Sequence, residues 1–267
     1  MCDQDHFEED LNRYSRRDVG ALAASVGVAM ALPRVANAVD VNESEVLIET
    51  PDGVCDAYYA APVSGQHAAV LIWPDIFGLR NAFRQMGKRM AETGYSVVVV
   101  NPFYRTQAAP TAPYGASTPI PEVRPFAQSL SPQTQVTDTR AFVSWLDAQD
   151  EVDSSRQIGS MGYCMSGSFV MRGAAALPDR IGAGCSFHGG GLTTDNDNSP
   201  HLLISQMDAE FLIAIAENDD ERDPESKDIL REAFVDANLN AEIEVYPAAH
   251  GWCPPDTLVY DFNQSER

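Results

Sequence analysis

Two early stretches of the chain, residues 44–50 and 55–61, alternate apolar and polar residues. Successive side chains of a β-strand point to opposite faces, so this alternation predicts two strands. The Pro-Asp-Gly sequence at residues 51–53 lies between them and is typical of a turn. We therefore expect a β-hairpin.

The next apolar runs are continuous, at residues 68–73 and 96–100, and a segment of helical spacing, 80–93, lies between them. Continuous runs indicate strands covered on both faces, and strand, helix and strand with short joins indicate a parallel sheet. Strand and helix patterns continue to follow one another along the chain. They predict strands at residues 156–160, 183–187, 211–216 and 241–246 and helices at 136–150, 169–177 and 225–237. The expected class is α/β, with a mostly parallel central sheet flanked by helices on both faces.

Residues 101–133 interrupt this pattern and hold seven of the chain's 17 prolines. Such an insertion usually lies over the carboxyl ends of the strands, where it can shape a substrate pocket. A surface loop without contact to the chemistry is the alternative.

Composition and charge narrow the possible partners. The 267-residue chain is 44% apolar, enough for a sizeable core, and 39 acidic against 18 basic residues give a net charge of −21. This charge argues against nucleic-acid and anionic-membrane binding. No run of 18 apolar residues follows residue 40, so no membrane span is expected there. We expect a monomer or a small homo-oligomer.

Five cysteines show neither Cys-x-x-Cys nor Cys/His spacing. The sequence therefore predicts no metal site. Disulfides among Cys55, Cys185 and Cys253 stay open.

Residues 1–38 differ from the rest of the chain. Arg16 and Arg17 precede a weakly apolar run at 20–32, and Ala-Asn-Ala at 36–38 resembles a cleavage site. This order predicts a twin-arginine-type export signal, a periplasmic or secreted protein, and a domain spanning 39–267. An amphipathic helix docked on the domain is the alternative.

The strongest chemical signal is the sequence Gly-Tyr-Cys-Met-Ser-Gly at residues 162–167, between a predicted strand and a predicted helix. A nucleophile at such a strained turn needs small residues two positions before and after it, and Gly162 and Ser166 satisfy this. The turn aims the backbone N–H of Met165 toward an oxyanion, and the following helix N-terminus favours a thiolate at Cys164. A structural cysteine in a tight joint is the alternative.

Two downstream signals complete a catalytic triad. Asp219 and Asp220 follow an apolar strand, and His250 follows the last predicted strand. Nucleophile, acid and histidine in this order, each on a loop after a strand, are typical of α/β-hydrolases. His250 would take the proton of Cys164, and the acid would orient His250. Asp219 is preferred, and Asp220 stays an alternative.

A second oxyanion donor is expected on the loop after residues 68–73, at the backbone N–H of Ile76. Two further residues carry open alternatives. His188 either lines the pocket or satisfies loop backbone, and Trp252 either walls the pocket or packs in the core.

Over residues 44–260 the chain resembles the dienelactone hydrolase family of α/β-hydrolases. The matching segments are the 162–167 sequence, Asp-Ile-Phe-Gly-Leu at 75–79, Asn-Pro-Phe-Tyr-Arg at 101–105, Asn-Asp at 218–219 and Ala-His-Gly at 249–251. The resemblance implies a single α/β domain that hydrolyses an enol-lactone or related ester without metal or cofactor. Carried over, it makes Cys164 the nucleophile, His250 the base, Asp219 its orienter, and the N–H groups of Ile76 and Met165 the oxyanion hole.

The resemblance also points to pocket residues. Asp75 stands where the family's best-known members have a glutamate that holds the resting thiol. Tyr104 and Arg105 are expected at the substrate pocket, Arg105 one residue from the position of a substrate-binding arginine. Trp252 and its neighbours replace a second such arginine. These departures keep acyl hydrolysis and leave the natural substrate open.

The last predicted strand leaves only about residues 257–267 for a final helix, so either that helix is short or the sequence is truncated. The predicted function is hydrolysis of a small-molecule ester or lactone through an acyl-Cys164 intermediate. The alternative is a non-hydrolytic thiol sensor or binding protein on the same fold.

Overall fold

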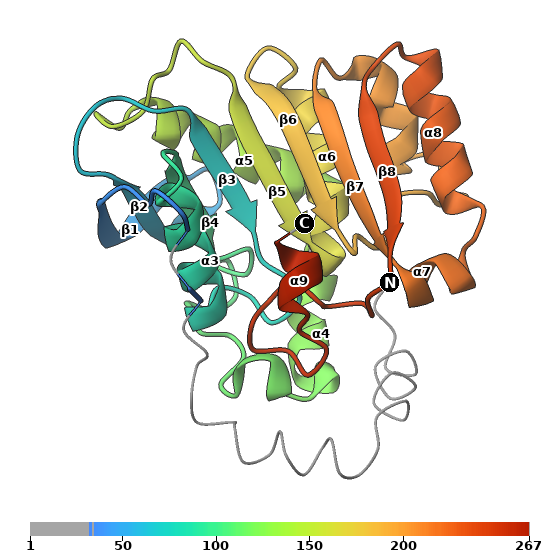
Figure 1. Ribbon diagram of the computed structural model, residues 1–267, viewed down its shortest axis with the longest axis horizontal. Helices are drawn as coiled ribbons and strands as arrows, with labels where there is room; N and C mark the ends of the chain where they lie inside the picture. The colour runs from blue at the N-terminus through green and yellow to red at the C-terminus, as the bar shows by residue number, and fades with distance from the viewer. Residues whose placement is uncertain (1–31, 34, 267) are drawn as a thin grey trace.

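The computed structural model describes residues 32–33 and 35–266 (Figure 1). The predicted export signal therefore lies largely outside the described residues. The strands are β1 (Val41–Thr50), β2 (Gly53–Pro62), β3 (Ala69–Trp73), β4 (Ser96–Val100), β5 (Ile158–Tyr163), β6 (Ile181–Phe187), β7 (Glu210–Ala216) and β8 (Ala241–Tyr246).

The α-helices are α3 (Asn81–Ala91), α4 (Ile120–Gln128), α5 (Pro132–Asp147), α6 (Gly167–Ala176), α7 (Glu217–Arg222), α8 (Ser226–Asp236) and α9 (Phe262–Ser265). Short 3-10 helices are η1 (Gly115–Ser117), η2 (Cys164–Ser166) and η3 (Pro200–Gln206).

All of these strands join one sheet in the order β1-β2-β4-β3-β5-β6-β7-β8. The β1–β2 and β2–β4 pairs are antiparallel, and every pair from β4–β3 to β7–β8 is parallel. The predicted hairpin and the mostly parallel sheet are thus confirmed.

Helices cover both faces of this sheet, as the continuous apolar runs predicted. In β3, Leu71 and Trp73 belong to the core cluster that includes α5, α6 and α8, whereas Val70 and Ile72 belong to the cluster on the side of α3. In Figure 1, α3 and α9 lie in front of the sheet, with α5 and α6 behind it. Because both faces are covered, every residue of β3 is buried.

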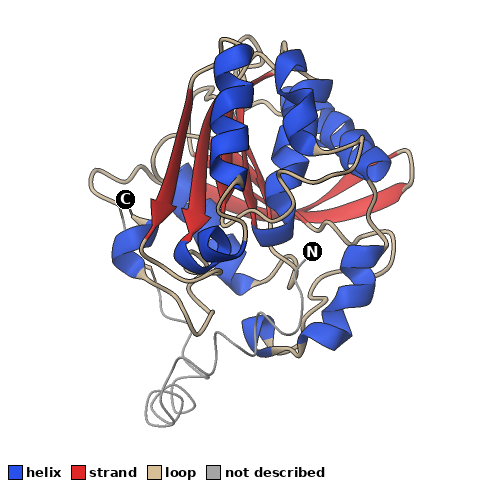
Figure 2. Cartoon of the chain, turned by 90° about the vertical axis from the view of Figure 1, so that its right-hand side faces the viewer, coloured by secondary structure: helices blue, strands red, loops and turns tan. Residues whose placement is uncertain are grey.

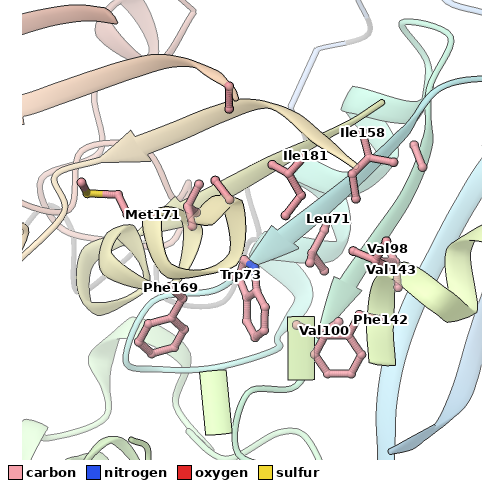
Figure 3. Close-up of a cluster of buried hydrophobic side chains, with 14 of the residues drawn as sticks. Leu71, Trp73, Val98, Val100, Phe142, Val143, Ile158, Phe169, Met171 and Ile181 are labelled. Carbon is pink, nitrogen blue, oxygen red and sulfur yellow. The ribbon is translucent and has the colours of Figure 1, made fainter. Parts of the chain in front are cut away.

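Trp73 is the large side chain at the centre of the α5 and α6 side (Figure 3). Its ring lies 5.4 Å from that of Phe142 on α5 and 5.7 Å from that of Phe169 on α6. Aromatic contacts of this kind fix both helices against the carboxyl end of β3.

Several predicted boundaries need correction. β5 continues to Tyr163, so the strand leads directly into the turn at Cys164. α5 begins at Pro132 because Ser131 forms a capping box with Thr134 and proline suits the first helical turn. The insertion at 101–133, for which the sequence predicts no helix, contains α4.

The carboxyl ends of the parallel strands meet at one edge of the sheet. Figure 2 shows strand arrowheads pointing toward the loops and short helices at the lower end of the molecule. Residues that follow β3, β5, β6, β7 and β8 therefore gather there. Within the described residues, no helix combines the length and apolarity that crossing a membrane requires.

Candidate active site

A cavity of about 250 Å³ lies at this edge of the sheet. Five of the six strands in parallel pairs are followed by a predicted site residue that lines this cavity: Asp75 and Ile76 after β3, Cys164 after β5, His188 after β6, Asp219 after β7 and His250 after β8. Asp75 and His250, which are 175 positions apart in the chain, therefore share one cavity.

The turn at Cys164 has the strained geometry that the sequence predicted. Cys164 has a φ of +55°, a left-handed conformation that residues with a side chain rarely adopt. A Cβ on Gly162 would lie 2.3 Å from the backbone oxygen of Ser166, so only glycine fits two residues before the cysteine. The Ser166 hydroxyl donates to the carbonyl of Pro74 at 2.5 Å and thereby ties the turn to the loop that carries Ile76.

The loop after β6 holds the backbone of Cys164 on both sides. The Cys164 N–H donates to Nδ1 of His188 at 3.1 Å, and the Gly190 N–H donates to the Cys164 carbonyl at 3.0 Å. Both roles considered for His188 therefore hold. Its side chain lines the cavity and also accepts a hydrogen bond from the backbone N–H of Cys164. Burial, and secondarily His250, lower the pKa of His188 well below its ordinary value, so the ring is neutral.

The acid and the histidine are joined directly. Oδ2 of Asp219 lies 2.6 Å from Nδ1 of His250, and the Asn218 side chain accepts from the His250 backbone N–H at 2.8 Å. Asp220 instead pairs with Lys227. The two carboxylates lie on helix α7 rather than on a loop, which corrects that prediction, and the helix turns them in different directions.

Asp75 occupies the position of a glutamate that holds the resting thiol in the family's best-known members, but its carboxylate is held by an ion pair with Arg80. The Arg80 guanidinium donates to both carboxylate oxygens of Asp75, at 2.6 and 2.9 Å, and to both of Asp256, also at 2.6 and 2.9 Å. Burial raises the pKa of the Asp75 carboxyl, and the Arg80 guanidinium opposes that shift. Arg80 therefore fastens the segment around Asp256 to the loop after β3.

Replacing Arg80 by methionine should destabilise the fold by about 3–5 kcal/mol, because it leaves the Asp75 carboxylate buried without a counter-ion. Arg84→Met is the matched control, since Arg84 pairs with Glu45, whose side chain is 60% exposed, and such pairs contribute about 0–1 kcal/mol. Urea denaturation of both variants gives the difference in free energy of unfolding. Equal midpoints for the two would contradict a structural role of the buried ion pair.

The structure does not bring Tyr104 and Arg105 to the cavity, which corrects their predicted role. The Tyr104 hydroxyl donates to Asp138 at 2.8 Å, and the Arg105 guanidinium binds Asp138 at 2.7 Å and Asp52 at 2.6 Å. Both side chains are thus used to join the hairpin turn to α5.

Trp252 is likewise absent from the cavity wall. The side chain is fully buried, stacks on Tyr246 at 5.4 Å between ring centroids, and meets the ring of His188 edge-on at 5.1 Å. The packing alternative for Trp252 is the one that the structure supports.

Other wall residues were not singled out from the sequence. They come from the proline-rich insertion, from the glycine run after His188, from α8 and from the C-terminal segment, and include Ala116, Ile120, Gly191, Leu230, Leu258 and Val259. The insertion therefore does shape the cavity. The run of three glycines at 189–191 was the available signal for close backbone approach.

The remaining cysteines in the described part of the chain are free thiols, so no bridge joins Cys55, Cys185 and Cys253. Burial raises the pKa of Cys185 to about 11 and also raises those of the other two. Among the described residues, no three His, Cys, Asp or Glu side chains are grouped as ligands to a metal ion.

The sequence model of the dienelactone hydrolase family matches residues 55–267. A Methylorubrum extorquens protein named "putative carboxymethylenebutenolidase" is 28% identical over 247 residues, covering 88% of this chain and 82% of the relative. A Synechocystis protein of the same name is 26% identical over 223 residues, covering 80% and 87%.

Solved structures agree at the level of the fold. A structure titled as a putative dienelactone hydrolase from Klebsiella pneumoniae has a TM-score of 0.74 at 22% identity, covering 85% of this chain and 94% of that one. A dienelactone hydrolase-like promiscuous phosphotriesterase from metagenomic libraries has a TM-score of 0.69 at 18% identity, covering 85% and 93%.

The sheet order and these structural neighbours define an α/β-hydrolase fold. Since the family model covers most of its length, the chain belongs to the dienelactone hydrolase family. Membership supports an enzyme that hydrolyses ester or lactone bonds, as the sequence predicted, and does not favour the thiol-sensor alternative.

Proposed function

We propose that this protein hydrolyses small carboxylic esters or lactones through a covalent acyl-Cys164 intermediate, with His250 and Asp219 completing the triad. The observation that carries the proposal is that Cys164, on its strained turn, and the hydrogen-bonded pair of Asp219 and His250 line the same cavity. A thiol at a strand-to-helix turn, a base and an orienting carboxylate are the parts that acyl transfer needs.

In the proposed reaction, Sγ of Cys164 attacks the substrate carbonyl while His250 takes the thiol proton. Asp219, bonded to Nδ1, leaves Nε2 of His250 to exchange protons. The backbone N–H groups of Ile76 and Met165 stabilise the oxyanion. The carbon–oxygen bond then breaks, the leaving alcohol takes the proton from His250, and water, deprotonated by His250, releases the acid and restores the thiol.

The cavity and the relatives support the proposed substrate class. Its wall is largely apolar, with Ile120, Ile215 and Leu230 among the lining residues, which suits a small organic ester. The names of the relatives refer to a butenolide, a cyclic ester. Arg105 is committed to Asp138 and so lends no charge to substrate recognition.

Trapping the acyl group tests the proposal. Mixing the protein with p-nitrophenyl acetate and quenching in acid within the first turnover should add one acetyl group, found by mass spectrometry on the peptide that contains Cys164. The thioester should disappear as free acetate forms. An acetyl group on another residue, or turnover without any adduct in a quench series, would contradict the proposed nucleophile.

The twin-arginine motif at Arg16 and Arg17 and the Ala-Asn-Ala sequence at 36–38 support the further proposal that the enzyme acts outside the cytoplasm.

A further inference from the structure

A second histidine lies beside the proposed base. His188 follows β6, is 1% exposed, and lines the same cavity as Cys164 and His250. Its ring centroid is 4.8 Å from that of His250. Its φ of +42° is a conformation that a residue with a side chain adopts only where its surroundings enforce it.

The hydrogen bond from Cys164 fixes the tautomer of this ring. Nδ1 of His188 accepts the Cys164 backbone N–H at 3.1 Å, so Nδ1 carries a lone pair and not a proton. A neutral imidazole with an accepting Nδ1 has its single proton on Nε2. Nε2–H is therefore a hydrogen-bond donor.

That donor is buried and unused by the protein. Within residues 32–33 and 35–266, Nε2 of His188 has no hydrogen-bond partner. A buried donor without an acceptor lowers stability, as does the left-handed backbone at the same residue. Two unfavourable features at one cavity residue point to a ligand that supplies the acceptor.

We propose that Nε2–H of His188 donates a hydrogen bond to the leaving-group oxygen of the substrate, next to His250, which protonates that oxygen. The proposal rests on the hydrolase function above. As the carbon–oxygen bond breaks, negative charge grows on this oxygen and the hydrogen bond strengthens, so His188 keeps its proton while the proton taken from Cys164 passes from His250 to the leaving group. His188 would be a catalytic residue of the acylation step.

A pair of acetate esters separates this role from a structural one. Phenyl acetate has a poorer leaving group than p-nitrophenyl acetate, and both give the same acetyl-enzyme. His188→Asn retains a side-chain oxygen near the Nδ1 position for the Cys164 N–H, tolerates a positive φ, and removes Nε2–H. It should lower kcat/KM about 10- to 100-fold for phenyl acetate and only a few-fold for p-nitrophenyl acetate. His188→Gln, which places an amide nitrogen near Nε2, should recover part of the loss.

His201→Asn is the matched control, because His201 lies on η3 and does not line the cavity. Equal losses for both esters in His188→Asn, or none, would overturn the proposal. If His188→Asn fails to fold, ¹⁵N NMR of wild-type protein with labelled histidine can show which ring nitrogen of His188 carries the proton. A proton on Nδ1 would overturn the proposal. If wild type hydrolyses neither ester, or Cys164→Ala is as active as wild type, the proposed function itself fails.

Discussion

Replacing Cys164 by alanine is expected to lower kcat/KM for p-nitrophenyl acetate on the order of 10⁵-fold, to near the uncatalysed rate, because the methyl side chain cannot attack the substrate carbonyl. Alanine keeps the small size that the turn demands, so the free energy of unfolding should change little. Initial rates at several substrate concentrations, together with a urea unfolding curve, measure both quantities.

Cys185→Ala is the matched control for the loss of a thiol. Cys185 lies on β6, beside β5, and does not line the cavity, so this variant should hydrolyse the ester like wild type. Cys164→Ser should retain a small part of the activity, since a hydroxyl can still transfer an acyl group. Full activity in Cys164→Ala would rule out the thiol as nucleophile.

The turn that carries Cys164 could be predicted because its requirements are local. The steric demand joins Gly162 to the backbone of Ser166, four residues later, and the pattern of small residues records it. The strands were predictable for a similar reason. β3 is covered on both faces, so each of its positions must be apolar.

The predicted pocket role of Arg105 failed because it depended on a distant partner. Asp138 lies 33 residues further along the chain, on α5, and binds the guanidinium that the resemblance had placed near the substrate. Spacing along the sequence shows that a cation is present but does not show which carboxylate it will meet. Helix α4 in the proline-rich insertion was missed for the same reason. It also depends on a distant segment, because it packs against Phe77 and neighbouring residues.

The choice between Asp219 and Asp220 was also beyond the sequence, since adjacent residues offer the same chemistry. Their place on α7 separates them, because successive helical side chains point about 100° apart. Asp219 meets Nδ1 of His250, whereas Asp220 points to Lys227.

Asp219→Ala should therefore lower kcat/KM about 10³- to 10⁴-fold, because His250 loses the carboxylate that fixes its tautomer and stabilises its charged form. KM should change little, since Asp219 acts through His250, and the loss should fall on kcat because the chemical step becomes slower. Steady-state kinetics with p-nitrophenyl acetate separate the two parameters.

Asp220→Ala removes an equally exposed carboxylate from the next position, with side-chain exposure of 24% in both cases, and breaks only the pair with Lys227. It should stay within about two-fold of wild type, as expected for the loss of one partly exposed ion pair. A large loss in Asp220→Ala with little change in Asp219→Ala would reverse the assignment of the acid. Comparable losses in both would mean that the geometry of α7, and not one carboxylate, orients His250.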